Sequence, residues 1–171
     1  KWTDRSRQAV ILDVRSTPEY KAGHPEGSYN VPYPFIYQYC DEAGRRPDGA
    51  CINGGDRVSQ DPLAFVTYVQ NIIPDKDTPI YTLCRTGVRS VGAANLLKEA
   101  GYTEVRNIWE GFVGVHLKDT NTYERSLDVN HDGNVDDLDK NGWRYYQGLP
   151  YATRLLPRLI YQDMAHTYLW D

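Results

Sequence analysis

Short apolar segments alternate with helix-forming segments through most of the chain, and this alternation restricts the fold more than any other feature. Residues 9–15 (AVILDVR) predict a buried strand, because the run is apolar until it ends in charged side chains. Residues 16–23 predict a short helix with a serine or threonine cap, Pro18 in the first turn and Gly23 at the end. Strands joined through helices pair in parallel, so the sequence predicts an α/β fold: a mainly parallel sheet flanked by helices.

The same pattern continues towards the middle of the chain. Asp61 can cap a helix and Pro62 suits its first position, and apolar residues then recur at helical spacing. Gly101 can end a later helix. The further expected elements are an extended piece at 28–33, a helix at 61–72, a strand at 78–84, a helix at 88–101 and a strand at 103–108.

Length and charge limit the possible partners. A chain of 171 residues with 40% hydrophobic content suits one domain with a core, so we expect a single domain over residues 1–171. The net charge is −4 and the 19 lysines and arginines are scattered, which indicates no nucleic-acid surface and favours a small ligand or a protein partner. No apolar run approaches the roughly 18 residues of a membrane span, so we expect no transmembrane segment.

Two of the three cysteines bracket a turn-rich segment. Cys40 and Cys51 enclose DEAGRRPDGA, and a disulfide between them leaves Cys84 as a free thiol. The alternative is two unpaired loop cysteines in a reducing cytoplasm. The disulfide interpretation favours the periplasm or the cell exterior, and the numbering would then begin after removal of a signal peptide, since no leader follows Lys1.

Cys84 directly follows an expected strand and precedes an expected helix, in the stretch YTLCRTGVRS. Ligands gather at the carboxyl ends of strands in open α/β sheets, and the next helix offers unpaired backbone N–H groups there. This setting, with Arg85 and Arg89 nearby, favours the thiolate and predicts a nucleophile. The alternative is a buried cysteine that merely packs at a strand end.

Several motifs in order carry a family resemblance. Residues 11–33 (ILDVRSTPEYKAGHPEGSYNVPY), 84–90 (CRTGVRS), 108–114 (IWEGFVG) and 142–150 (GWRYYQGLP) resemble segments of the rhodanese, or single-domain sulfurtransferase, family. The resemblance implies an enzyme of the thiosulfate sulfurtransferase type. A Cys84 thiolate would take a sulfur from a small anionic donor such as thiosulfate, hold it as a persulfide and pass it to cyanide or a thiol.

The resemblance also implies roles for individual residues. Asp13 and Arg15 would orient the loop, and Glu19 and His24 would brace nearby turns. A related phosphatase group has its arginine six positions after the cysteine, whereas Arg89 here lies at the fifth, which favours sulfur over phosphate. The expected donor-binding residues are Arg85, Thr86, Gly87, Val88, Arg89 and Ser90, with the two arginines on the anionic oxygens and the backbone amides around the persulfide.

Three segments depart from a minimal domain of this kind. They are an insertion at 33–57 around the cysteine pair, an insertion at 115–140, and a tail at 151–171. The tail contains several leucines and ends in aromatic residues. It is interpreted either as a segment packed on the domain or as an aromatic surface for a protein partner.

The second insertion contains a twelve-residue pattern typical of EF-hand calcium loops. Oxygen-bearing side chains occupy positions one, three, five, nine and twelve of DVNHDGNVDDLD, and Gly133 lies at position six. A single loop of this kind, which resembles those of dockerin modules, predicts a structural calcium ion. The alternative is an acidic turn without metal. The expected ligands are Asp128, Asn130, Asp132, Asn134, Asp136 and Asp139, while His131 at position four points outward.

Three functions remain open at this point. The first is an exported, calcium-stabilised sulfurtransferase that acts through a Cys84 persulfide. The second is a non-catalytic rhodanese-fold scaffold or binding module in an extracellular or periplasmic assembly. A third is thiol redox, or delivery of persulfide sulfur to a protein partner, in place of turnover on small molecules. Intact Cys84, Arg85 and Arg89 favour the first, because a scaffold has no physical need for them.

Overall fold

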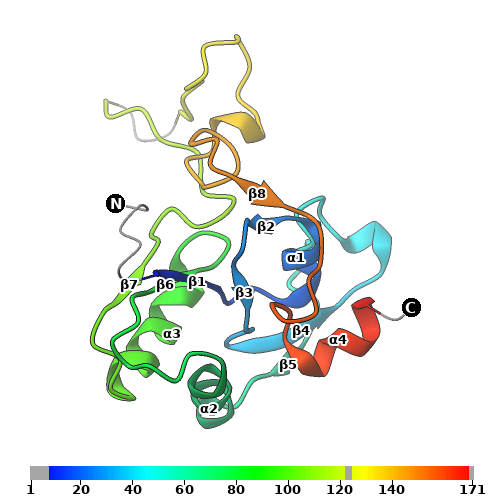
Figure 1. Ribbon diagram of the computed structural model, residues 1–171. Coiled ribbons are helices and arrows are strands. Elements are labelled where there is room, and N and C mark those ends of the chain that lie inside the picture. Colours follow the sequence, from blue (N-terminus) through cyan, green and yellow to red (C-terminus); the bar gives the residue numbers. More distant parts are fainter. Residues whose placement is uncertain (1–7, 122–124, 170–171) are drawn as a thin grey trace.

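The computed structural model describes residues 8–121 and 125–169, and its centre is a parallel sheet (Figure 1). The strands lie in the order β3-β1-β6-β7 and all pairs are parallel. This arrangement confirms the α/β prediction. The strands are β1 (Val10–Asp13), β3 (Tyr29–Asn30), β6 (Ile80–Leu83) and β7 (Val105–Asn107).

Three helices connect and flank these strands: α1 (Thr17–Ala22), α2 (Pro62–Ile72) and α3 (Val88–Glu99). Their ends follow the expected signals. The Asp61 side chain accepts the Ala64 N–H at 2.9 Å at the start of α2. At the start of α1, the N–H and hydroxyl of Ser16 both donate to the Glu19 carboxylate.

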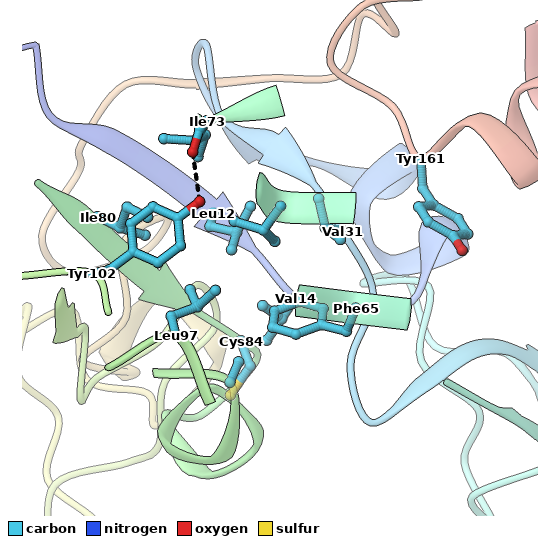
Figure 2. Close-up of a cluster of buried hydrophobic side chains, with 12 residues drawn as sticks. Leu12, Val14, Val31, Phe65, Ile73, Ile80, Cys84, Leu97, Tyr102 and Tyr161 are labelled. Atoms are coloured by element: carbon cyan, nitrogen blue, oxygen red, sulfur yellow. Dashed lines mark hydrogen bonds between the residues drawn. The ribbon is translucent and has the colours of Figure 1, made fainter. Parts of the chain in front are cut away.

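The main core lies between the sheet and the helices. Figure 2 shows Leu12, Phe65 and Leu97 packed together, with the sulfur of Cys84 at the edge of the cluster. Each such side chain, fully buried, stabilises the fold by about 1.5–3 kcal/mol. Cys84 is therefore anchored in the main hydrophobic core of the domain.

The insertion at 33–57 is more ordered than the loop that the sequence indicated. It is an antiparallel hairpin of β4 (Phe35–Tyr39) and β5 (Asp56–Ser59), with a 3-10 turn η1 (Glu42–Gly44) between them. A disulfide joins Cys40 and Cys51, as predicted. The sequence did not predict these strands. All of β5 is exposed, so its residues do not alternate between apolar and polar as those of a half-buried strand do.

The tail returns to the domain and packs on it. Strand β8 (Tyr151–Ala152) pairs with β2 (His24–Pro25), and α4 (Gln162–Leu169) ends the described chain. Leu159, Ile160 and Tyr161 are buried, and the Asn30 N–H donates to the Leu159 carbonyl at 2.7 Å. Packing on the core, one of the two interpretations of the tail, is confirmed for these residues.

The insertion at 115–140 projects from the opposite end of the molecule to α2 (Figure 1, yellow). Isolated bridges join His116 to Lys140 and Lys118 to Ser126, and a 3-10 turn, η2 (Asp137–Asp139), closes its acidic loop. Among residues 8–121 and 125–169 there is no helix long and apolar enough to cross a membrane.

Candidate active site

Cys84 lies between the end of β6 and the start of α3, as the sequence predicted. It is the free cysteine of the chain, and its residue is 1% exposed. The hydroxyl of Ser90, in the first turn of α3, lies 3.3 Å from the Cys84 sulfur and 3.2 Å from the Gly87 carbonyl, so its single hydrogen has two acceptors within reach. A hydroxyl in this position stabilises negative charge on sulfur.

The loop after Cys84 turns its carbonyl groups towards the segment that follows β7. The Cys84 carbonyl accepts the Phe112 N–H at 2.8 Å, and the Arg85 carbonyl accepts the Val113 N–H at 3.0 Å. The Gly87 carbonyl accepts the side-chain amide of Asn107 at 3.0 Å. The carbonyl side of the loop is therefore held by protein groups.

The N–H groups of the same loop have no such partners. In the described part of the chain, no hydrogen bond has the backbone N–H of any residue from 85 to 90 as its donor. Consecutive free amides in a turn that leads into a helix form a concavity suited to an anion. Residues 85–90 thus present backbone N–H groups without protein acceptors, as a cradle for an anion would require.

Gly87 makes this turn possible. Its φ is 86°, in the left-handed region, and it directly precedes α3. A Cβ atom at this position would collide with the Trp109 carbonyl. Both the backbone conformation and the close approach of the next segment therefore require glycine.

Arg89 is held by a carboxylate from α1. Its Nη1 and Nη2 donate to the two oxygens of Glu19 at 2.9 and 2.7 Å. Burial alone would raise the pKa of Glu19, but the charge and hydrogen bonds of Arg89, helped by Arg15, lower that pKa from 4.5 to about 2. Glu19 in turn raises the pKa of Arg89 against the effect of burial. Both groups are ionised in the folded protein.

Arg85 is held from the other side by the cysteine-bounded insertion. Its Nε donates to Asp48 at 2.7 Å, and its side chain is 24% exposed. Within the described ranges, no hydrogen bond uses its Nη atoms. Gly49 lies against the backbone of Pro18 and Glu19, so the insertion is docked closely on α1. The insertion therefore positions a residue of the cysteine loop.

Asp13 and Arg15 form a buried pair behind the loop. Arg15 donates from Nη2 to Asp13 at 2.6 Å and to the Gly23 carbonyl at 2.6 Å. Its guanidinium lies 4.2 Å from the centre of the Phe112 ring. Because the Phe112 N–H binds the Cys84 carbonyl, this pair supports the loop indirectly.

His24 braces a turn. Its Nδ1–H donates to the Tyr20 carbonyl at 2.8 Å, and its ring stacks on that of Tyr20. Burial lowers its pKa, so the ring is neutral near pH 7. A neutral, stacked and hydrogen-bonded imidazole has a structural role here.

A cavity of about 360 Å³ opens beside the cysteine loop. One wall comes from the loop and from the start of α3, and the opposite wall comes from the insertion. The lining residues that carry charge are Glu19, Arg46, Arg57, Arg85 and Arg89. Since Glu19 is already paired with Arg89, the lining carries an excess of positive charge in a chain whose net charge is negative.

The acidic loop at 128–139 is organised by its own backbone. Asp128 accepts the N–H groups of Asp132 and Gly133, and Asp139 accepts those of Val129 and Asp136. His131 is exposed, with φ at 61°. No cluster of three or more His, Cys, Asp or Glu side chains that could hold a metal occurs in residues 8–121 and 125–169. The loop is preceded by extended chain and closed by η2, without the α-helices of an EF-hand in the described residues.

Asp48, Asn107 and Phe112 contact residues of the cysteine loop, and sequence reasoning did not single them out. Asp48 lies in a turn, far from Arg85 in sequence, and nothing local indicates their contact. Phe112 falls within the segment IWEGFVG, whose resemblance to a family motif was the available signal.

Comparisons with known proteins show which family this chain belongs to. The rhodanese-like domain family matches residues 2–118. Rhodanese-like domain-containing protein 17 from Arabidopsis thaliana is 33% identical over 106 residues, which cover 61% of this chain and 56% of that protein. Thiosulfate sulfurtransferase 18 from the same plant is 29% identical over 121 residues, which cover 70% of this chain and 76% of that protein. Uncharacterized protein YqhL from Bacillus subtilis is 27% identical, and the match spans 60% of its length.

The crystal structure of Rv0390 from M. tuberculosis has the same overall architecture. It superposes with a TM-score of 0.54 at 26% identity, over 90% of this chain and 89% of that one. A parallel α/β sheet that presents a cysteine in a loop of free backbone amides defines an α/β domain with a cysteine loop at a strand end. Within that class, the chain belongs to the rhodanese-like domain family, which matches well over half of its residues.

Proposed function

We propose that this protein is a sulfurtransferase that moves a sulfane sulfur from thiosulfate or a similar donor to a thiophilic acceptor through a persulfide on Cys84. The observation that carries the proposal is the row of free backbone N–H groups at residues 85–90 around a cysteine whose sulfur lies within hydrogen-bond distance of the Ser90 hydroxyl. Relatives named thiosulfate sulfurtransferases, at about 30% identity, point the same way.

In the first half-reaction the Cys84 thiolate attacks the outer sulfur of thiosulfate. A bond forms between Sγ and that sulfur, the sulfur–sulfur bond of the donor breaks, and sulfite leaves with the electron pair. The product is a persulfide anion on Cys84. The amides of residues 85–90 and the Ser90 hydroxyl donate to this anion, so they stabilise charge where it accumulates.

The two arginines divide the expected donor-binding role. Arg89 commits both Nη groups to Glu19, so it contributes positive charge and a fixed wall. Arg85 keeps its Nη groups for the anionic oxygens of the donor, while Asp48 holds its Nε. Thr86, Gly87 and Val88 contribute backbone amides between them.

The decisive experiment is a single turnover. Incubation with thiosulfate should add the mass of one sulfur atom to the peptide containing Cys84 and release one sulfite per chain, and cyanide or a thiol should then remove the sulfur. The C84S variant should do neither. Folded wild-type protein that takes up no sulfur and releases no sulfite would remove the enzyme proposal.

The alternative function is a non-catalytic scaffold or binding module. The observation in its favour is that Glu19 and Asp48 already occupy part of both arginines, as they would in a purely structural network. The same single turnover decides between the two, because a scaffold forms no persulfide.

We also propose a structural calcium ion in the loop at 128–139. Its donors would be oxygens of Asp128, Asn130, Asp132, Asn134, Asp136 and Asp139, a set that suits a hard cation. The positive φ of Gly133 and the Asp128 bonds to the Asp132 and Gly133 N–H groups are consistent with a folded loop. The ion would neutralise crowded carboxylates and stiffen the insertion.

For the location of the protein we propose the periplasm or the cell exterior. The Cys40–Cys51 disulfide supports this, because disulfides persist in oxidising compartments. Extracellular calcium concentrations would also keep a weak loop site filled. Recovery of the protein from its native source with both thiols free would contradict the proposal.

A further inference from the structure

Two arginines of the insertion line the cavity opposite the cysteine loop. Arg46 follows η1, and Arg57 lies on β5. In the described ranges neither guanidinium forms an ion pair, although Arg57 stacks over the Phe35 ring with its Cζ 4.9 Å from the ring centre. A ligand in the cavity could therefore bind the N–H groups of both side chains without breaking an ion pair within the protein.

Both arginines are exposed residues, and several contacts hold the backbone that carries them. The Cys40–Cys51 disulfide closes the turn, and Cys51 itself lines the cavity. The Arg46 N–H donates to the Ala50 carbonyl at 2.8 Å, and Gly49 lies against the backbone of α1. The positive charges on this wall thus come from a docked and cross-linked element.

The cavity is larger than the donor requires. Its volume of about 360 Å³ is that of roughly a dozen water molecules at ~30 Å³ each, and it lies at the lower end of the range for small-molecule sites. A thiosulfate ion on the loop amides and the Arg85 Nη groups would leave the insertion wall uncovered. The remaining space and charge suit a second, longer molecule.

We propose that Arg46 and Arg57 form an anion subsite that selects the sulfur acceptor, and that the acceptor is a small thiol carrying one or more carboxylates. This inference rests on the proposed sulfurtransferase function. Guanidinium groups bind carboxylates through paired, charge-assisted hydrogen bonds, which orient the acceptor as well as hold it. Arg46 and Arg57 are thus specificity-determining residues.

The second half-reaction then proceeds from a bound acceptor. Its thiolate attacks the outer sulfur of the Cys84 persulfide, and a new sulfur–sulfur bond forms. The bond between that sulfur and Cys84 Sγ breaks, and Cys84 leaves as a thiolate that the Ser90 hydroxyl stabilises. The acceptor departs as a persulfide, and no outside oxidant or reductant is needed.

The test measures discharge of a preloaded persulfide by thiols of different charge. The protein is loaded with thiosulfate, freed of donor and mixed with mercaptosuccinate, 3-mercaptopropionate, 2-mercaptoethanol or cysteamine. For each thiol, the rate with R46Q/R57Q is divided by the rate with wild type, so that the intrinsic reactivity of the thiol cancels. We expect kcat/KM for mercaptosuccinate to fall by about 10-fold or more, and that for 2-mercaptoethanol to change by less than about 2-fold.

A matched control removes the same charge elsewhere. R106Q/R158Q makes the same change at two arginines outside the cavity lining and should leave the preference for anionic thiols unchanged. Single variants R46Q and R57Q keep the experiment decisive if the double variant folds poorly. Equal losses for neutral and anionic thiols, or no loss for either, overturn the proposal.

A binding measurement separates this inference from the enzyme proposal. Titration of wild-type protein with succinate should shift the Nε–H signals of Arg46 and Arg57 in NMR spectra, whether or not a persulfide forms. Absence of these shifts overturns the subsite. Shifts without persulfide formation would show that Arg46 and Arg57 bind a carboxylate, but that the protein does not transfer sulfur.

Discussion

Arg89 and Glu19, seventy residues apart in sequence, form a two-point ion pair with distances of 2.9 and 2.7 Å. Glu19 also accepts the Ser16 hydroxyl at 2.8 Å, so one carboxylate joins the cap of α1 to the first turn of α3. The Glu19 side chain is 1% exposed and that of Arg89 is 20% exposed, so the carboxylate is shielded from water and the guanidinium largely so. A buried pair of this kind fixes the register between the two helices flanking the cysteine loop.

The first prediction concerns loss of this pair. E19Q should lower the free energy of unfolding by about 3 kcal/mol, because it leaves the Arg89 charge without its partner in a largely buried place. E104Q is the control, because Glu104 pairs with Arg106 at 3.9 Å on the surface. This substitution should lower the free energy of unfolding by less than about 1 kcal/mol. Urea unfolding of both variants checks the difference, and equal losses would contradict it.

The same pair predicts a pH dependence of stability. The folded state lowers the pKa of Glu19 from 4.5 to about 2, so its contribution is fully present above about pH 4.5. As the pH falls from 4.5 to about 2, the unfolded chain binds a proton that the folded protein does not, and stability is lost. Wild type should therefore lose more stability than E19Q across this interval in acid titrations followed by circular dichroism.

Gly87 provides the second prediction. G87A should cost at least about 3 kcal/mol and prevent persulfide formation, because alanine is strained at a φ of 86° and its Cβ meets the Trp109 carbonyl. G101A is the matched control, with φ at 97° and open space around the added atom, and should cost about 1–2 kcal/mol. Thermal unfolding compares the two, and a G87A protein as stable as G101A would refute the close approach.

A third prediction concerns the hydroxyl beside the sulfur. S90A should slow sulfite release from thiosulfate by about 10- to 100-fold, because it removes a hydrogen bond of the strength typical for charged groups. S28A removes another fully buried hydroxyl, one without a partner in the described chain, and should leave both the rate and the stability nearly unchanged. Single-turnover kinetics supply the measurement; unchanged rates in S90A would remove its role.

The calcium proposal gives a fourth prediction. Adding calcium to chelator-treated protein should raise the melting temperature of wild type but not of D128N, which keeps an oxygen for the Gly133 N–H and loses a charged ligand. D137N is the control, because Asp137 is outside the ligand pattern and pairs with Lys140. An identical melting temperature for wild type with and without calcium would eliminate the site.

The disulfide gives the last prediction. C40S/C51S should lose about 2–3 kcal/mol of stability, since the bridge closes a short loop with a separation of 11 residues. Asp48 lies inside this loop and holds Arg85, so the thiosulfate KM should rise as well. Reduction of the wild type should reproduce both changes, and a stable variant with an unchanged KM would show that the insertion holds its shape without the bridge.

Much of the fold was predictable because its signals are local. Strands β1 and β6 are apolar runs, and α2 begins where Asp61 and Pro62 indicate. The hairpin β4–β5 was not predictable, because β5 is exposed and its pairing depends on a partner across the disulfide-closed turn. The position of Cys84 was predictable from its place between a strand and a helix.

By itself, the sequence determined the parallel α/β sheet, the position of Cys84 at a strand end and the cysteine pairing, because each depends on residues close together in the chain or on motifs in order. Only the tertiary structure decided that Arg89 is committed to Glu19, that Asp48 holds Arg85, and that the insertion supplies the facing wall of the cavity. The physical reason is that charge pairing and cavity shape depend on which distant segments meet when the core is buried, and sequence spacing does not encode that distance.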